Sequence, residues 1–128
     1  MIQISEHAMN DYVKKFNAAD EFYFKEGCFI VEMSNGSDDA DVSIAQARVE
    51  TGQQTRWHWL NDTFERYVIL QGEGLVEVGA EEPTEVQAGN IIIIPPQTRQ
   101  RIKNIGTTDL KFLAICTPRF SHRNYRNL

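Results

Sequence analysis

The strongest constraint on the fold is a long series of short β-rich runs separated by turn residues. From Phe22 onward, runs such as CFIVEM, VSIAQARV, FERYVIL and LKFLAICTP alternate with SNGSDDAD, ETGQQT, QGEG and QAGN. β-Branched and aromatic residues favour strands, whereas clusters of Gly, Asn, Asp and Ser favour turns. No second helical pattern interrupts the series, so the sequence predicts about eight to ten strands in an all-β sandwich or barrel. A chain of 128 residues fits a single domain.

The two ends of the chain differ from this pattern. Apolar side chains recur at three- and four-residue spacing near the N-terminus: Met9, Tyr12, Val13 and Phe16. This spacing predicts a short N-terminal helix within residues 1–20. Residues 118–128 are rich in arginines and aromatic rings, and we expect them to form a tail packed on the surface.

Charge and cysteine content exclude several classes of protein. The formal net charge is −5, so a surface that follows phosphate groups is not expected and nucleic acid is an unfavourable partner. The longest purely aliphatic run is IIII at 91–94, and the N-terminus lacks the pattern of a signal peptide. Cys28 and Cys116 lie far apart in apolar surroundings, which predicts buried free thiols. We therefore expect a soluble cytoplasmic protein without a membrane partner.

Two glycine-punctuated segments carry the most specific pattern in the chain. The first has, in order, Gly52, five residues, His58, Trp59, Leu60, four residues, Glu65, six residues and Gly72. The second has, in order, Gly89, five residues, Pro95, Pro96, Gln97, two residues, Gln100, three residues and Asn104. Together they resemble the paired motifs of the cupin superfamily, in its small single-domain barrels, and the spacing agrees at every fixed position.

The resemblance implies a fold and the residue ranges of its parts. It implies an all-β double-stranded β-helix, also called a jelly-roll barrel, which a short N-terminal helix precedes. We expect one cupin domain over residues 1–128, with a core barrel at about 40–117, a helical segment at 1–20 and the tail at 118–128. Since this fold hosts unrelated chemistries, function has to be argued from the site.

Three positions depart from the cupin pattern, and two of them are metal-ligand positions. Leu60 and Gln100 stand where the family usually has histidines, and Gln97 stands where it has a glycine, whereas His58 and Glu65 match. Alternate residues of a strand share a face. If the faces of the three strands line the barrel interior, His58, Glu65 and Gln100 converge on one point, which is a degenerate form of the family's metal site.

One interpretation of this site keeps a metal. His58, Glu65 and Gln100 would supply one nitrogen and two oxygens, a set that holds Mn, Fe, Ni or Zn weakly. Leu60 places an apolar side chain where a fourth ligand would lie. His122 in the tail is a replacement ligand only if the tail folds over the barrel mouth, and no spacing supports it. The resemblance then implies a dioxygenase-like or lyase-like activity.

The preferred interpretation needs no cofactor. Some cupin epimerases and isomerases use a histidine without metal, so the resemblance implies that His58 is the acid or base and that Glu65 orients it. Arg56 would hold an anionic or carbonyl oxygen of the ligand, and Tyr67 and Gln100 would donate or accept hydrogen bonds. The expected ligand is a small polar metabolite, either a sugar or a keto acid.

Three alternatives without chemistry stay open. The missing histidines also fit a module that binds a small ligand and does not transform it. His58 and Glu65 can also satisfy one another inside a barrel that has no function there, because buried polar groups need partners in any case. The third is an interaction domain with an empty barrel, which is favoured only if bulky apolar side chains such as Leu60 and Ile102 fill the interior.

A homodimer is the expected assembly. Four consecutive isoleucines at 91–94 imply burial on both faces of one strand, since a strand with one wet face alternates apolar and polar residues. The cupin resemblance points the same way.

Overall fold

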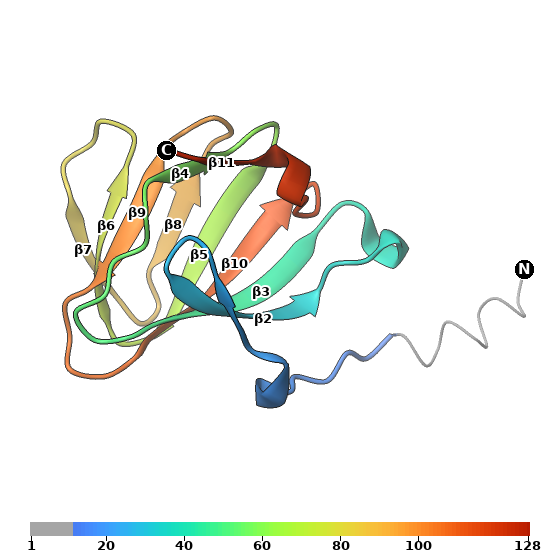
Figure 1. Ribbon diagram of the computed structural model, residues 1–128, viewed down its shortest axis with the longest axis horizontal. Helices are drawn as coiled ribbons and strands as arrows, with labels where there is room; N and C mark the ends of the chain where they lie inside the picture. Colours follow the sequence, from blue (N-terminus) through green and yellow to red (C-terminus); the bar gives the residue numbers. More distant parts are fainter. Residues whose placement is uncertain (1–11) are drawn as a thin grey trace, which may run out of the picture.

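The computed structural model describes residues 12–128 and consists of two antiparallel β-sheets that enclose one core (Figure 1). The strands are β1 (Phe22–Phe24), β2 (Cys28–Ser34), β3 (Ser43–Val49), β4 (His58–Leu60), β5 (Phe64–Gln71), β6 (Glu73–Val78), β7 (Thr84–Gln87), β8 (Ile91–Ile94), β9 (Gln100–Asn104), β10 (Leu110–Thr117) and β11 (Tyr125–Asn127). Three short 3-10 helices accompany them: η1 (Ala18–Asp20), η2 (Ser37–Asp39) and η3 (His122–Asn124). One sheet has the order β1-β2-β3-β10-β5-β8, and the other has the order β11-β4-β9-β6-β7.

This topology confirms the all-β jelly-roll fold. The sheets extend beyond the expected core at residues 40–117, because β1 and β2 precede it and β11 follows it. The described residues form eleven strands, where the sequence predicts about eight to ten. The difference reflects three-residue strands: β11, for example, forms in the tail because it pairs with β4 (Figure 1).

The predicted N-terminal helix is not found in the described part of the chain. Residues 13–17 are not helical, and the regular turn near them is η1 at Ala18–Asp20. Tyr12, Val13 and Phe16 are exposed, so within residues 12–128 no surface buries this part of the apolar stripe that would stabilise a helix. Residues 1–11, which carry the rest of that prediction, lie outside the described residues. No described helix is both long and apolar enough to cross a membrane.

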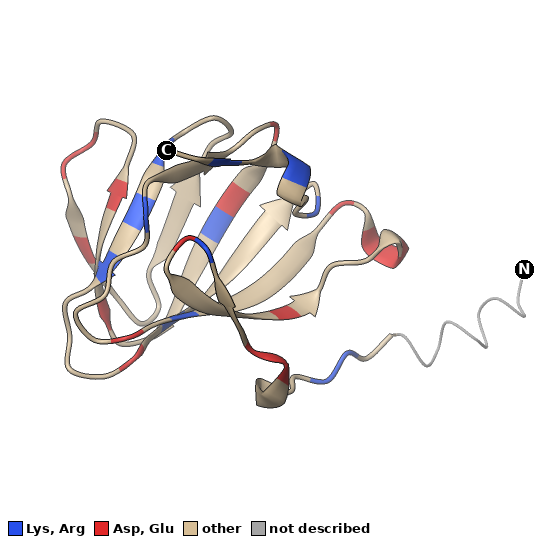
Figure 2. Ribbon diagram, viewed as in Figure 1, with Lys and Arg blue, Asp and Glu red and all other residues tan. Residues whose placement is uncertain are grey.

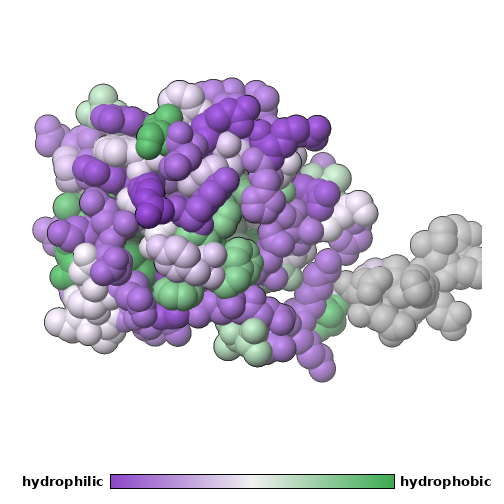
Figure 3. All heavy atoms as spheres, in the orientation of Figure 1, coloured by the Kyte–Doolittle hydropathy of each residue, from purple (hydrophilic) through white to green (hydrophobic). Residues whose placement is uncertain are grey.

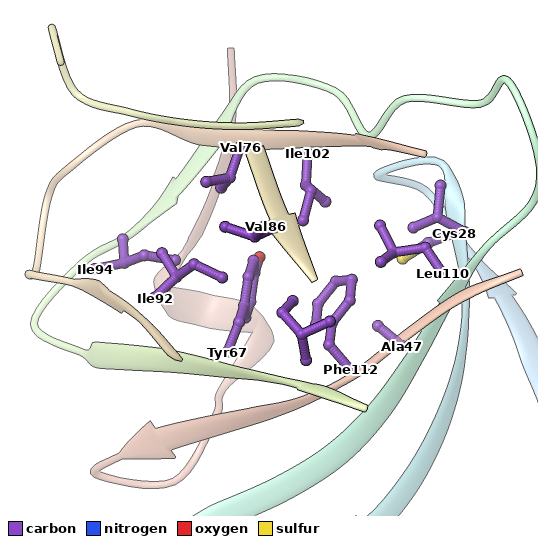
Figure 4. Packing of buried hydrophobic residues seen from close by; sticks show 12 residues of the cluster. Cys28, Ala47, Tyr67, Val76, Val86, Ile92, Ile94, Ile102, Leu110 and Phe112 are labelled. Atoms are coloured by element: carbon purple, nitrogen blue, oxygen red, sulfur yellow. The ribbon is translucent and has the colours of Figure 1, made fainter. Parts of the chain in front are cut away.

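Alternation along the strands builds the core between the sheets. On β5, Tyr67 and Ile69 are buried while Val68 between them is partly exposed. Figure 4 shows Tyr67 and Phe112 pointing toward side chains of the other sheet such as Ile102. Each fully buried side chain of this size contributes about 1.5–3 kcal/mol relative to an exposed one. Ile102 thus fills the interior, as the sequence suggests for an apolar barrel, although a cavity persists at one end.

The turn next to β9 shows what replaces the glycine of the cupin pattern. Gln97 has φ 55 and Asp62 has φ 53, a conformation that is unusual for residues with a side chain. The two side chains compensate one another, because Gln97 Nε2 donates to Asp62 Oδ1 at 3.2 Å and the backbone N–H of Asp62 donates to Gln97 Oε1 at 3.3 Å. The turn therefore keeps the shape that glycine normally allows.

Strand β8 is buried on one face within a single chain. Ile92 and Ile94 are buried, whereas Ile91 and Ile93 are 63% and 60% exposed. The isoleucine run does not have both faces covered, because nothing in the described chain packs on the outer face of β8. Its neighbour on β5, Val68, lies beside Ile91 and is also partly exposed. Exposed branched side chains of this kind suit a protein interface. A single chain does not test the homodimer, which stays a prediction.

The substitution Ile93→Asp tests this prediction. We expect the protein to scatter light as a particle of twice its chain mass of 14.7 kDa at micromolar concentration. Burying a carboxylate in an apolar interface is costly, so Ile93→Asp should weaken association by about 100-fold or more. The matched control is Ile105→Asp, at another exposed isoleucine, which directly follows β9 of the other sheet. A monomeric mass for the unmodified chain would contradict the predicted dimer.

Candidate functional site

The hairpin between β1 and β2 closes one end of the barrel. Gly27 has φ 102, and a Cβ atom there would lie 3.3 Å from the carbonyl oxygen of Gln54, so glycine suits this turn. The backbone N–H of Gly27 donates to the Phe24 carbonyl at 2.9 Å, and the N–H of Arg56 donates to the Glu26 carbonyl at 2.7 Å. Figure 2 shows acidic positions both in this turn and on β5, which lies behind it. The turn thus carries Glu26 over the barrel interior.

His58 forms its ion pair with Glu26 and not with Glu65. His58 is 2% exposed, and its Nε2 lies 2.7 Å from Glu26 Oε2. Its Nδ1 lies 2.7 Å from the carbonyl oxygen of Arg56. The ring of Tyr125 stacks on it at 5.4 Å between centroids. The expectation that Glu65 orients His58 is therefore corrected, since Glu26 and the backbone hold both ring nitrogens.

The environment of His58 favours its charged form. Burial alone would lower the pKa of the ring, but the charge and hydrogen bond of Glu26, the Arg56 carbonyl and the charge of Glu65 together raise it to about 9. Compared with the usual value of 6.5, this corresponds to about 3 kcal/mol of preference for the imidazolium. At neutral pH both nitrogens donate hydrogen bonds, so the ring has no free lone pair for a proton or a metal.

Glu65 and Gln100 form a second buried network next to this pair. Gln100 Nε2 donates to Glu65 Oε1 at 2.6 Å, and Cys116 Sγ donates to Glu65 Oε2 at 3.6 Å. The Tyr67 hydroxyl donates to Gln100 Oε1. Burial raises the pKa of Tyr67 well above its usual value and also raises that of Cys116, so both groups stay protonated as donors. The predicted convergence of Glu65, Tyr67 and Gln100 is present in this network.

The carboxyl group of Glu65 titrates near neutral pH. Glu65 is 8% exposed. Burial raises its pKa, the nearby charge of Glu26 adds to the effect, and the donors Gln100 and Cys116 together with His58 oppose it, with a result of about 7. A carboxyl group with this pKa can both accept and release a proton at neutral pH.

Arg56 does not share the interior position expected from strand alternation. Strand β4 begins only at His58, so the alternation does not extend back to Arg56. Its side chain is exposed and donates to the carbonyl oxygen of Lys25. Arg56 therefore fastens the β1–β2 hairpin to the barrel and is not placed among the interior groups.

The three predicted metal ligands do not form a ligand set. His58 points its Nε2 to Glu26, while Gln100 and Glu65 hydrogen-bond to each other. Leu60 is buried beside Cys116 and Tyr125, so the fourth ligand position is apolar. Among residues 12–128, no group of three or more His, Cys, Asp or Glu side chains is arranged to hold a metal ion. The arrangement does not fit a divalent metal, and we derive no step through one.

A cavity of about 60 Å³ opens next to Glu65, between the β1–β2 hairpin and the sheet formed by β3, β10 and β5. Its polar lining residues are Glu26, Glu32, Glu65, Ser43 and Cys116. Aromatic rings from β1 and the tail form the rim: Phe22, Phe24, Phe120 and His122. No described lysine or arginine lines it. His58 lies behind Glu26 and is not part of the wall.

Sequence reasoning missed Glu26 and the aromatic rim. Glu26 lies outside both glycine-punctuated motifs, and the only local signal is the turn glycine that follows it. Tyr125 gave no signal either, because its role depends on β11 pairing with β4. His122 does fold over the barrel mouth, where its ring lies 5.0 Å from that of Phe120, but it belongs to the rim and not to a metal-ligand group.

The fold and this site define a class: an all-β jelly-roll barrel with a polar cluster and a cavity at one end. The sequence pattern of the family described as "Cupin domain" matches residues 45–116. An uncharacterised protein of Methanocaldococcus jannaschii, MJ1618, is 37% identical over 102 residues, which are 78% of this chain and 81% of that protein. The chain belongs to the cupin family.

Further similarities lie with proteins of several activities. The oxalate-binding protein of Thermotoga maritima is 31% identical over 72 residues, which are 56% of this chain and 59% of that protein. Among solved structures, the nucleoside dehydratase Pac13 of Streptomyces has a TM-score of 0.73 at 17% identity and covers 91% of each chain. KdgF of Halomonas has a TM-score of 0.71 at 16% identity and covers 82% of this chain and 94% of that one. At these identities, the structural likeness establishes the fold alone.

The raised pKa of Glu65 predicts how stability depends on pH. The folded chain holds this proton up to about pH 7, whereas an unfolded glutamate releases it near 4.5. The contribution of Glu65 to the free energy of unfolding is therefore fully present below about pH 4.5 and is lost as the pH rises through 7, by about 3 kcal/mol in total. In Glu65→Gln this loss should disappear, which urea unfolding at pH 4.5 and pH 8 would measure.

The control for this measurement is Glu85→Gln. Glu85 is an exposed residue on β7, and its replacement should leave the pH dependence of stability unchanged. An identical pH dependence in the unmodified chain and in Glu65→Gln would contradict the raised pKa.

Restoring the family's histidines should create a metal site. Leu60 follows His58 by two residues on the same strand face, and Gln100 is the cross-strand partner of His58. We expect Leu60→His combined with Gln100→His to bind Ni²⁺ at least about tenfold more tightly than the unmodified chain, because imidazoles replace an apolar and an amide group. Calorimetric titration at pH 9.5, where His58 is largely neutral, measures this. No gain in affinity would mean that positions 58, 60 and 100 do not converge.

Proposed function

We propose that this cupin binds a small polar metabolite in the cavity at the barrel mouth and transfers a proton to or from it, as an isomerase or epimerase does. The observation that carries the proposal is the position of Glu65, whose carboxyl group lines the cavity and has a pKa of about 7. General acid–base catalysis is most effective when the pKa of the group lies near the working pH.

Glu65, and not His58, is the proton-transfer group in this proposal. The imidazolium of His58 keeps both nitrogens engaged and lies behind Glu26, so a ligand in the cavity does not reach it. The His58–Glu26 pair acts on Glu65 electrostatically: the carboxylate raises the pKa of Glu65, and the imidazolium lowers it. Gln100 and Cys116 fix the orientation of the carboxyl group by donating one hydrogen bond to each of its oxygens.

The charges of the wall favour a sugar-like ligand over a keto acid. Three carboxylates line the cavity and no described lysine or arginine faces them, so a ligand carboxylate would meet like charges. Hydroxyl groups instead donate hydrogen bonds to carboxylates. With a volume of about 60 Å³, the cavity holds one end of such a molecule, and the remainder extends past the aromatic rim.

The second candidate is a binding module without chemistry. The observation that favours it is that two protein donors hold Glu65, since a carboxylate fixed in this way is also suited to holding a ligand in place. A relative named for oxalate binding shows that the family includes proteins named for a ligand alone.

Exchange of carbon-bound hydrogen with solvent separates these two candidates. An isomerase or epimerase that removes a proton next to a carbonyl group introduces deuterium there when the reaction runs in D₂O. We expect exchange with at least one member of a panel of D-fructose, D-ribulose, dihydroxyacetone and D-glucosamine, measured by proton NMR. Glu65→Gln should slow this exchange by about 100-fold or more, the usual range for a general base.

Glu85→Gln serves again as the control, because Glu85 is exposed on β7, away from the cavity. A rate that Glu65→Gln leaves unchanged would remove Glu65 from the proposed role. Binding in the cavity without any exchange across the panel would favour the binding module.

A further inference from the structure

The wall of the cavity leaves negative charge without a partner. Glu26 is matched by the imidazolium of His58. Glu32 accepts a hydrogen bond from Asn35 at 2.9 Å and Glu65 accepts from neutral donors, but within residues 12–128 neither forms an ion pair with a lysine or arginine. Glu65 is buried, and a carboxylate in a partly enclosed cavity attracts a positive charge more strongly than it would in open water, whereas Glu32 is exposed at the edge of the cavity.

The rim presents aromatic rings to the same cavity. The rings of Phe24 and Phe120 lie 6.3 Å apart at 84°, and those of Phe120 and His122 lie 5.0 Å apart at 81°. Rings at nearly right angles form a corner and not a stack, and the faces of such rings attract ammonium groups. Hydrophobic side chains gather near the centre of the face shown in Figure 3, where Figure 1 shows the β1–β2 hairpin, and hydrophilic residues surround them.

Within the chain, the ammonium group of Lys25 contacts one ring of the rim, Phe24, and the neighbouring ring of Tyr125. Lys25 Nζ lies 4.7 Å from the ring centroid of Tyr125 and 6.0 Å from that of Phe24. Lys25 does not line the cavity. The ammonium group of Lys25 therefore lies against these rings but not among the carboxylates of the cavity.

One buried polar atom near the cavity lacks a partner. Tyr125 is 6% exposed, and within the described chain its hydroxyl group has no hydrogen-bond partner. Burial raises the pKa of this hydroxyl, and the charges of Glu26 and Glu65, both of which line the cavity, raise it further. A buried hydroxyl without a partner is uncommon in folded proteins. Tyr125 does not itself line the cavity, and it borders the site through its ring, which lies 5.3 Å from that of Phe24.

We propose that the cavity takes a small organic cation, a protonated amine whose ammonium group lies between the carboxylates of Glu65 and Glu32 and against the rings of Phe24, Phe120 and His122. This inference rests on the proposed function in one respect, that the cavity is the ligand site. It narrows the ligand class to molecules such as amino alcohols and amino sugars, whose N–H groups can also reach polar atoms of the wall.

A matched series of probes tests the sign of the ligand charge. Ethanolamine, ethylene glycol and glycolate have similar size and carry a positive charge, no charge and a negative charge at pH 7.5. We expect ethanolamine to bind the full chain at least about tenfold more tightly than ethylene glycol, and glycolate to bind most weakly. Titrations followed by NMR also locate the probe, through the amide signals of Glu65 and Phe120.

Three variants locate the interaction. Glu65→Gln removes a carboxylate. It should weaken the binding of ethanolamine about tenfold or more and change the affinity for ethylene glycol by less than about twofold. Phe120→Leu keeps an apolar side chain but removes the ring, and it should weaken the binding of ethanolamine by about three- to tenfold. His122→Ala, at an exposed position, is a second rim variant that spares the core and should act in the same direction. The control is Phe29→Leu, on β2 and outside the cavity wall.

Each outcome decides one point. Equal binding of ethanolamine and ethylene glycol at the cavity would overturn the cation preference and leave the proposed ligand site intact. Ethanolamine binding that neither Glu65→Gln nor the rim variants weaken would place the amine elsewhere and also overturn it. If only an uncharged sugar exchanged hydrogen and the protein had no affinity for ethanolamine, the proposed function would be supported and the proposed preference for a cation would be contradicted.

Discussion

The buried pair between His58 and Glu26 joins the two parts of the molecule that form the site. Glu26 lies in the β1–β2 hairpin, and His58 begins β4 of the opposite sheet. Removing one partner of a buried ion pair typically costs about 3–5 kcal/mol, because the other charge is left without compensation. The backbone and side chain of Arg56 add hydrogen bonds to the same hairpin. This closure positions Phe24 and Glu26 and so creates the cavity.

The pair also explains why the site can differ from the usual cupin arrangement. In a metal-binding cupin, a cation bound by histidines compensates the buried glutamate. Here His58 itself carries the positive charge, and its counter-ion comes from outside both motifs. Gln100 then needs no imidazole, since its amide links Tyr67 to Glu65. Leu60 packs against Cys116 and Tyr125 where a further ligand would otherwise lie. The substitutions at positions 60 and 100 therefore form one consistent arrangement.

The sequence predicts the fold better than the site because the fold depends on local patterns. Alternation on β5 places Glu65 and Tyr67 inside, and the spacing of the two motifs predicts that Gln100 lies near them. The partner of His58 could not be predicted in this way, because it depends on how a distant hairpin folds over the barrel. Alternation also fails for Arg56, since β4 is too short to include it. Periodicity alone predicts the N-terminal helix, and in the described part of that segment the exposed Phe16 has no surface to cover and residues 13–17 are not helical.

The charge of the ligand decides which role Glu65 can play. With a pKa of about 7, the carboxyl group is divided between its neutral and ionised forms at neutral pH. A cationic ligand binds more tightly to the ionised form, and by linkage it lowers the pKa of Glu65 and leaves it a base. An uncharged ligand displaces water from the carboxyl group without supplying charge, which raises the pKa and leaves Glu65 an acid. His58 changes little in either case, because Glu26 keeps its charge compensated. The barrel thus holds one fixed ion pair beside one carboxyl group whose protonation state the ligand selects.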